Sequence, residues 1–352
     1  MVSDLISRIA SLQSFGDRKI SDGGFLSVRK NNSFFYYRYD NNLFATASIG
    51  FILKGLKPYL AEKESLEVSS ILGKLIPSIE PYQNKDGLKI YNFWTTRPTN
   101  HFPFGYLMRH FKHFKLPDDI DDTALAYLVK GYAREDLEWL KRKLMTHAED
   151  AGVYNTWFGE DMPLEHDVCA LCNLMYLVFE SGLPLNEFDE GTLSFLKEVI
   201  EGRDYLSNTF WVSRHYASVS LIVYHYGRFL GRFRPEGFDK VKLELIKTIP
   251  LLFEEEPVWM NKVLLQTAFL KLGGMDESVA KWDATDIAWE TKWRKEPFAA
   301  FIGAPLAPYD FSWTRFLAAK KLFQIQWKCE AHELALILEN VILRNNYEQH
   351  AR

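Results

Sequence analysis

The acidic segment Leu116-Pro117-Asp118-Asp119-Ile120-Asp121-Asp122-Thr123-Ala124 is the strongest chemical signal in the sequence. It places four carboxyl groups within five residues, at the start of an apolar helical pattern. Ionised carboxyl groups this close repel one another, so at least one pKa must rise unless water surrounds them all. A carboxyl group with a raised pKa can act as a general acid, and grouped carboxylates can bind a metal ion.

A helix start offers a simpler explanation for part of this segment. Aspartate is favoured there because its side chain accepts hydrogen bonds from free backbone N–H groups and because the helix dipole attracts negative charge. One aspartate meets that need, whereas the segment holds four. The dipole lowers an aspartate pKa and the neighbouring carboxylates raise it, so the residues leave both interpretations open.

Several other segments share this arrangement of polar residues followed by small and apolar ones. One marker residue from each is Asn42, Asp122, Asp167, Arg214, Asn261 and Arg315. Successive markers lie 80, 45, 47, 47 and 54 residues apart. An interval of about 46 residues is long enough for one helix out and one helix back. The first interval is longer and therefore holds an insertion, at about 80–117.

The elements that position these residues are predicted to be helices. Apolar spacing of 3.6 residues dominates and two-residue alternation is nearly absent, so the sequence predicts an all-α protein. Predicted helices cover about 3–14, 43–60, 64–79, 121–131, 134–148, 165–181, 190–201, 213–231, 236–253, 258–272, 312–327 and 330–346. Six repeats predict one domain over 1–352, a single (α/α)6 toroid of inner and outer helices; an open solenoid is the alternative.

In a toroid the inner helices would all begin at one rim. The insertion and a second long loop, at about 283–311, would lie at that rim near the pocket. Aromatic residues at or before the predicted inner-helix starts would line it: Trp94, Tyr154, Trp157, Trp211 and Trp313. Aromatic faces attract a cation by ~0.5–2 kcal/mol each, although ordinary packing also explains such residues. Arg97 on the insertion could hold a diphosphate, or be a solvated loop charge.

Asp119-Ile120-Asp121-Asp122-Thr123-Ala124 resembles the Asp-x-Asp-Asp-Thr-Ala motif of class II terpene cyclases, the superfamily of squalene–hopene and diterpene cyclases. The resemblance implies an α/α toroid in which Asp121 protonates an alkene or epoxide of an isoprenoid, with Asp119 and Asp122 as its partners. It also implies a group that holds the acid's proton geometry, for which His166 is our candidate. No cofactor is needed for protonation, and Mg²⁺ would enter only with a diphosphate substrate.

The chain also departs from that family. It has room for one toroid only, and the repeated Gln-Trp signature of squalene cyclases is reduced to Gln326-Trp327. One alternative is a carbohydrate-active α/α toroid, in which paired carboxylates such as Asp121 and Asp167 cleave a glycosidic bond. The other alternative is a non-catalytic helical-repeat binding protein.

Composition narrows the partners. Lys plus Arg number 42 against 46 for Asp plus Glu, a net charge of −4 with no basic block, so no nucleic acid is expected. Three cysteines and a charged N-terminus without an apolar run predict a cytoplasmic protein. Peripheral membrane contact stays open, because apolar surface patches are not visible in a sequence, and so does the oligomeric state.

Overall fold

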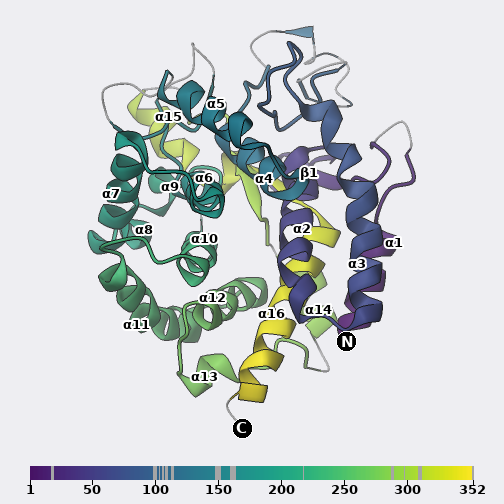
Figure 1. The fold of residues 1–352 in the computed structure, drawn as a ribbon, viewed down its shortest axis with the longest axis vertical. Coiled ribbons are helices and arrows are strands. Elements are labelled where there is room, and N and C mark those ends of the chain that lie inside the picture. The colour runs from purple at the N-terminus through teal and green to yellow at the C-terminus, as the bar shows by residue number, and fades with distance from the viewer. Residues whose placement is uncertain are drawn as a thin grey trace.

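The computed structural model describes residues 1–16, 20–97, 101–102, 104, 107, 110–111, 115–146, 152–158, 164–216, 218–286, 289–296, 298–307 and 311–350. It is mostly helical, with one small antiparallel sheet (Figure 1). The strands are β1 (Ser27–Asn31), β2 (Tyr36–Asp40), β3 (Phe301–Gly303) and β4 (Ile325–Lys328). None of the described helices combines the length and the apolar character that crossing a membrane requires.

Six helices pack on one another in a series that returns to its first member. They are α2 (Leu43–Leu56), α4 (Ile120–Lys130), α6 (Val168–Ser181), α10 (Val219–Arg232), α12 (Trp259–Lys271) and α16 (Glu330–His350). Each packs on the next, and α16 packs back on α2. Figure 1 shows the six around the middle of the molecule. Their residues are buried on most sides, which is expected of helices surrounded by other elements.

The remaining helices lie outside this series or connect its members. They are α1 (Val2–Ser11), α3 (Glu62–Leu75), α5 (Arg134–Met145), α7 (Glu187–Glu201), α8 (Asp204–Ser207), α9 (Thr209–Val212), α11 (Asp239–Glu255), α13 (Glu277–Ala280), α14 (Trp289–Lys295) and α15 (Ser312–Ala318). Among them α3 packs on α2, α7 on α6 and α11 on α12. Each of these three helices buries an apolar face and exposes a polar one, which is the pattern expected of outer helices.

Side-chain caps explain why three of the predicted markers stand at helix starts. The Asn42 side chain accepts a hydrogen bond from the backbone N–H of Ala45 at the start of α2. The Asp167 side chain does the same for Cys169 at the start of α6. The segment around Asp122 starts α4 in the same way, with Asp119 as the cap. Each cap satisfies a backbone donor that the helix leaves free.

The last marker is wrong. Arg315 lies in the short α15, and the sixth helix of the series is α16, which begins at Glu330. The predicted helix over 312–327 ends at Ala318 and is followed by β4, which pairs with β1 and β3. Strand pairing with residues far away along the chain overrides the helical pattern here, and no local sequence signal shows it.

The sheet itself is absent from the sequence-based prediction. Its strand order is β2-β1-β4-β3, and it joins the N-terminal region to the segment before α16. The buried face of β1 is formed by Ser27, Arg29 and Asn31, whereas Val28 is only half-buried. Because the buried residues are polar, the strand lacks the apolar alternation by which strands are recognised.

Glycine allows α10 and α12 to approach each other closely. A Cβ added at Gly227 would lie 2.7 Å from the Cβ of Ala268, closer than real Cβ contacts. We therefore expect Gly227→Ala to lower the free energy of unfolding by ~1–3 kcal/mol, the usual result of overpacking. Urea unfolding followed by circular dichroism measures the change.

The matched control is Gly73→Ala in α3, where an added Cβ meets nothing within 4 Å. Alanine is preferred to glycine in a helix by ~0.5–1 kcal/mol, so this variant should be neutral or more stable. If the two substitutions changed the free energy of unfolding equally, close packing around Gly227 would not be the cause of the change.

Candidate functional site

The aspartates that begin α4 are buried. Asp119, Asp121 and Asp122 expose only 5%, 6% and 3% of their surface. Asp119 is the N-cap of α4, and its Oδ1 accepts the backbone N–H of Asp122 at 2.8 Å. The capping interpretation is therefore right for Asp119. It does not account for Asp121 and Asp122, which lie within the first turn.

Asp121 is held by donors from neighbouring elements. The Asn173 side chain of α6 donates from Nδ2 to Oδ1 at 2.5 Å, and the Tyr216 hydroxyl donates to Oδ2. Arg228 of α10 donates to the amide oxygen of Asn173 and so orients that amide. Burial raises the pKa of Asp121, and the hydrogen bonds from Tyr216 and Asn173 oppose that rise. Both carboxyl oxygens accept hydrogen bonds, an arrangement that favours the ionised form.

Asp122 has different surroundings. Burial and the carboxyl groups of Asp119 and Asp121 raise its pKa well above its ordinary value. Its Oδ1 is buried and has no hydrogen-bond partner among the residues that the structure describes. Burial, followed by Asp121, raises the pKa of Asp119 to about 7. The pKa values of both Asp119 and Asp122 are therefore raised, because each is buried and each lies beside another carboxyl group.

His166 does not lie beside Asp121 as predicted. Its Nδ1 is 3.1 Å from the carbonyl oxygen of Tyr154, and its ring packs against Phe195. The groups that hydrogen-bond Asp121 are Asn173 and Tyr216, and neither is a histidine. His166 follows Glu165 directly in the chain, and its ring contacts Phe195 of α7.

His215 belongs to a buried charge cluster with Glu165 and Asp167. Its Nε2 lies 2.9 Å from Glu165 Oε1, and its backbone N–H donates to Asp167 Oδ2 at 3.0 Å. Burial alone would lower the pKa of His215, but the two carboxylates raise it to about 9. Burial would raise the pKa of Glu165, but His215 and Arg214 lower it. Arg214 marks a predicted helix start in the sequence, whereas no spacing distinguishes His215 beside it.

Glu165, Asp167 and His215 are also the residues that could hold a cation, because one ligand atom from each lies within 4.8 Å of the others. Positive charge is already present, however. Arg214 lies 3.3 Å from Glu165 Oε2, and His215 is itself protonated at neutral pH. Asp167 also accepts hydrogen bonds from Ser213 and from the start of α6. Ion pairing and helix capping therefore account for this cluster.

The His215–Glu165 pair predicts a pH dependence of stability. An unfolded histidine titrates near 6.5, and the folded pKa of His215 is about 9. Because the folded pKa is raised, the contribution is complete below about pH 6.5 and is lost as the pH rises through about 9. Glu165→Gln should reduce this loss, as measured by urea unfolding between pH 6 and 9.5. Identical pH profiles for the variant and the parent protein would contradict the assignment.

Two of the predicted aromatic residues lie close to charged groups of the site. Trp94 donates from Nε1 to the buried carboxylate of Asp40, at 3.3 Å. Trp157 packs edge-on against His215, with ring centroids 5.4 Å apart. The bridge partners of Asp119 include both Tyr91 of the insertion and Trp157, so the described part of the insertion lies against the start of α4.

The other predicted contact residues are placed elsewhere. The Tyr154 hydroxyl is hydrogen-bonded to Asn186 and Asp189, at the start of α7. Trp211 has the guanidinium groups of Arg214 and Arg315 over its ring. Trp313 is exposed, and so is Arg97, which donates to the carbonyl oxygen of Lys85 at 2.6 Å. The structure therefore does not bring these four residues together with Asp121.

A different set of aromatic rings surrounds the partner of Asp121. Tyr216 packs edge-on against Phe44 and Phe301, with ring centroids 5.5 and 5.6 Å apart. Phe301 is stacked on Phe93, with centroids 5.0 Å apart, and on His215. These phenylalanines come from α2, β3 and the insertion, so no local spacing in the sequence relates them. We call Phe44, Phe93, Tyr216 and Phe301 the aromatic wall.

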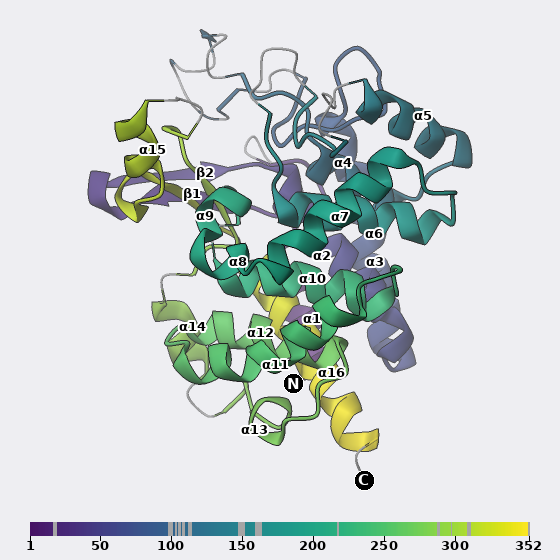
Figure 2. The ribbon, with the colours of Figure 1, turned by 90° about the vertical axis from the view of Figure 1, so that its left-hand side faces the viewer.

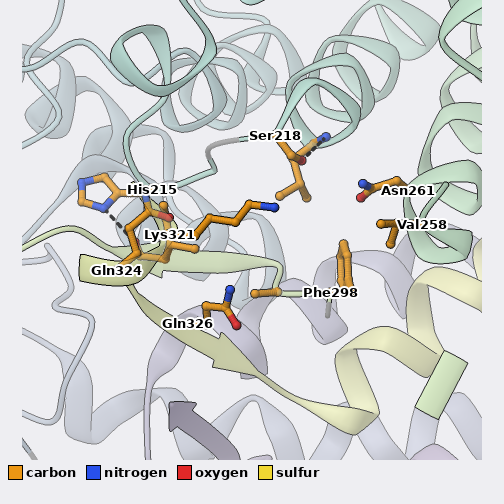
Figure 3. A pocket seen from close by; sticks show the side chains of 11 residues that line it. His215, Ser218, Val258, Asn261, Phe298, Lys321, Gln324 and Gln326 are labelled. Carbon is orange, nitrogen blue, oxygen red and sulfur yellow. Dashed lines mark hydrogen bonds between the residues drawn. The ribbon is translucent and has the colours of Figure 1, made fainter. Parts of the chain in front are cut away.

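A pocket opens beside His215, between the starts of α10 and α12 and the strands β3 and β4. It is lined by His215, Ser218, Leu221, Val258, Asn261, Phe298, Ala299, Ile302, Lys321, Gln324 and Gln326. Figure 3 shows Lys321 extending towards Ser218, with Asn261 and Gln326 on other sides. The cavity itself measures about 90 Å³. This volume is well below the ~300–1,000 Å³ of typical small-molecule sites.

No protein-family model, curated protein or solved structure was found to match the chain. His215 links the pocket to two of the buried carboxyl groups. It lines the pocket, and it contacts Glu165 and Asp167. Pocket, histidine and carboxyl groups together define the candidate site.

Proposed function

We propose that the six mutually packed helices form a single (α/α)6 toroid, and that the protein is a terpene-cyclase-like enzyme acting on an isoprenoid. The return of the helix series from α16 to α2 supports a closed ring over a solenoid, since the ends of a solenoid lie far apart. The positions of α3, α7 and α11 on the outside of their partners support the division into inner and outer helices.

The observation that carries the catalytic proposal is the burial of Asp122 next to Asp119 and to the hydrogen-bonded Asp121, with the raised pKa of Asp122 that follows from it. Protonation of an alkene requires a carboxylic acid that stays protonated and is removed from bulk water. Asp122 meets both conditions through its burial and its raised pKa. We therefore assign the proton to Asp122, and give Asp121 the role of a fixed negative charge near the cation. The motif resemblance alone would give the proton to Asp121.

In this reaction the O–H bond of Asp122 breaks as the π electrons of the substrate form a C–H bond. The carboxylate remains, and a carbocation forms on the substrate and is attacked by the next double bond. Loss of a proton from the final cation returns Asp122 to its acid form, so no oxidant, reductant or cofactor is consumed. The aromatic wall supports the proposal because aromatic faces stabilise a cation that water would trap.

The polar lining of the pocket favours a second candidate, a carbohydrate-active enzyme. Its polar residues are His215, Ser218, Asn261, Lys321, Gln324 and Gln326. Such groups would hydrogen-bond the hydroxyls of a sugar, whereas an isoprenoid has few groups to bond with them. In that enzyme Asp121 and Asp167 would supply the paired carboxyl groups of glycoside cleavage.

One assay separates these functions. The purified protein is incubated with farnesyl diphosphate, geranylgeranyl diphosphate and squalene, with and without Mg²⁺, and in parallel with an oligosaccharide panel. Mass spectrometry then identifies the products. Cyclic isomers of an isoprenoid are the expected result, and a need for Mg²⁺ would indicate that a diphosphate is bound. Oligosaccharide hydrolysis without isoprenoid conversion would favour the second candidate, and inactivity on both panels would favour a binding protein.

A further inference from the structure

A group of exposed apolar side chains projects from the sheet and α15. It consists of Phe34, Phe35, Tyr37, Phe311, Trp313, Phe316 and Leu322, which we call the aromatic surface. Single exposed apolar residues are common on soluble proteins, but contiguous groups of large ones usually mark an interaction site. The individual residues come from two segments about 280 residues apart in the chain.

Direct contacts join the two segments. The rings of Phe34 and Phe323 pack with centroids 6.1 Å apart, and Asn31 donates to the carbonyl oxygen of Leu322 at 2.8 Å. The short 3₁₀ turn Lys321–Phe323 packs in turn against α15. Figure 2 shows the end of β1 and β2 and the helix α15 projecting on the same side of the molecule. These contacts place the turn between β1 and β2 beside the segment that follows α15.

Phe35 has a conformation that folding alone does not explain. Its side chain is 97% exposed, and its backbone has φ of 52° in the left-handed region. Asparagine and glycine are favoured at such a position, and a bulky residue is disfavoured. Phenylalanine therefore gains nothing from packing here and carries a conformational cost, which indicates a role in contact with another surface.

The charge around the aromatic surface is basic. The exposed basic residues of 27–40 and 311–328 are Arg38, Arg315, Lys320 and Lys321, whereas Lys30 is half-buried and Lys328 is paired with Glu333 at 3.4 Å. The only acidic residue of these two ranges is Asp40, which is fully buried and paired with the buried Arg29. The whole chain has a net charge of −4, so this basic region contrasts with the rest of the protein.

We propose that the aromatic surface docks on an anionic membrane, with the rings at the level of the lipid headgroups and the basic side chains on their phosphates. Exposed aromatic and aliphatic residues combined with Lys and Arg are the combination that binds the membrane interface. A second copy of the chain would carry the same positive charge and would be repelled. Lys321 also lines the pocket, so docking brings the pocket mouth to the bilayer. The inference that the membrane supplies the isoprenoid rests on the proposed function. Docking itself requires no turnover.

Vesicle sedimentation tests the proposal with the full chain. Vesicles of equal parts phosphatidylcholine and phosphatidylserine should bind the protein, and pure phosphatidylcholine vesicles should bind it much less. Phe35→Asn combined with Phe316→Ser should weaken binding at least ~10-fold, since burial of apolar side chains contributes to interfacial affinity. Asparagine suits the left-handed conformation at position 35, so the variant should fold. Lys320→Gln with Lys321→Gln should remove the preference for phosphatidylserine.

The matched control replaces Leu251 and Met275 by serine, two exposed apolar residues outside the aromatic surface. This variant should bind vesicles like the parent protein. Equal weakening by the control, or no binding of the parent protein to anionic vesicles, would overturn the proposal. A dimer in analytical ultracentrifugation that disappears in the Phe35→Asn/Phe316→Ser variant would assign the surface to a second copy instead. If the proposed function holds, the Phe35→Asn/Phe316→Ser variant should turn over detergent-dispersed substrate at the same rate as the parent protein. This measurement separates a failure of docking from a failure of catalysis.

Discussion

Asp122→Asn is expected to lower the turnover of an isoprenoid at least ~100-fold, because positioned acid catalysis contributes ~10²–10⁴-fold. Water is too weak an acid to protonate an alkene in its place. Stability should change little, since a neutral amide replaces a neutral carboxyl group and can donate to Asp119 as the acid does. Product analysis by mass spectrometry and urea unfolding measure the two quantities.

Asp121→Asn is the informative comparison. This substitution removes the charge that faces Arg228 and turns one accepting oxygen into a donor towards Tyr216 or Asn173. It should therefore lower stability as well as turnover. If Asp122→Asn retains full activity and Asp121→Asn loses it without a change in stability, then Asp121 is the acid, as the motif resemblance implies.

Asp40→Ala is expected to lower the free energy of unfolding by about 3–5 kcal/mol, because it leaves the buried charge of Arg29 without its carboxylate. Arg29 lies 3.2 Å from Asp40, and both side chains are buried. Asp40 also accepts hydrogen bonds from Asn42 at 2.9 Å and Trp327 at 2.8 Å. The substitution therefore disconnects β4 and the start of α2 from β2. Urea unfolding provides the measurement.

The control for this prediction is a surface ion pair. Glu244→Gln removes the partner of Arg203, an exposed residue, at a separation of 2.7 Å. Exposed pairs contribute ~0–1 kcal/mol, because water screens the charges and the side chains lose entropy. A similar loss of stability in the two variants would mean that the burial of Asp40 and Arg29 has no energetic consequence.

The helix starts show how far the sequence reaches towards the fold. Asn42 and Asp167 were marked from polar residues before apolar runs, and both are N-caps because capping is a local interaction. Arg315 was marked by the same criterion and is wrong, since β4 follows α15 and pairs with β1, almost 300 residues earlier. A pattern that is read over one helical turn contains no information about such pairing.

The candidate site shows the same difference between what local sequence patterns predict and what tertiary packing decides. The sequence identified the aspartates of α4. Burial is the main cause of their raised pKa values, and the neighbouring carboxyl groups add to it at Asp119 and Asp122. His166 was predicted to neighbour Asp121, whereas its side chain contacts Tyr154 and Phe195, and the groups that hydrogen-bond Asp121 are Asn173 and Tyr216. Each of these contacts depends on the packing of segments that are separated in the chain, which a local pattern does not describe.

By itself, the sequence determined the helical class of most of the chain, several helix starts and the acidic segment, because periodicity, caps and charge crowding act between near neighbours. The tertiary structure alone decided the surroundings of each carboxyl group. Asp121 receives donors from Asn173 and Tyr216, which belong to other parts of the fold, while Asp122 receives none at its buried Oδ1 among the described residues. A pKa depends on every group within a few ångströms, and those groups are brought together only when distant segments pack.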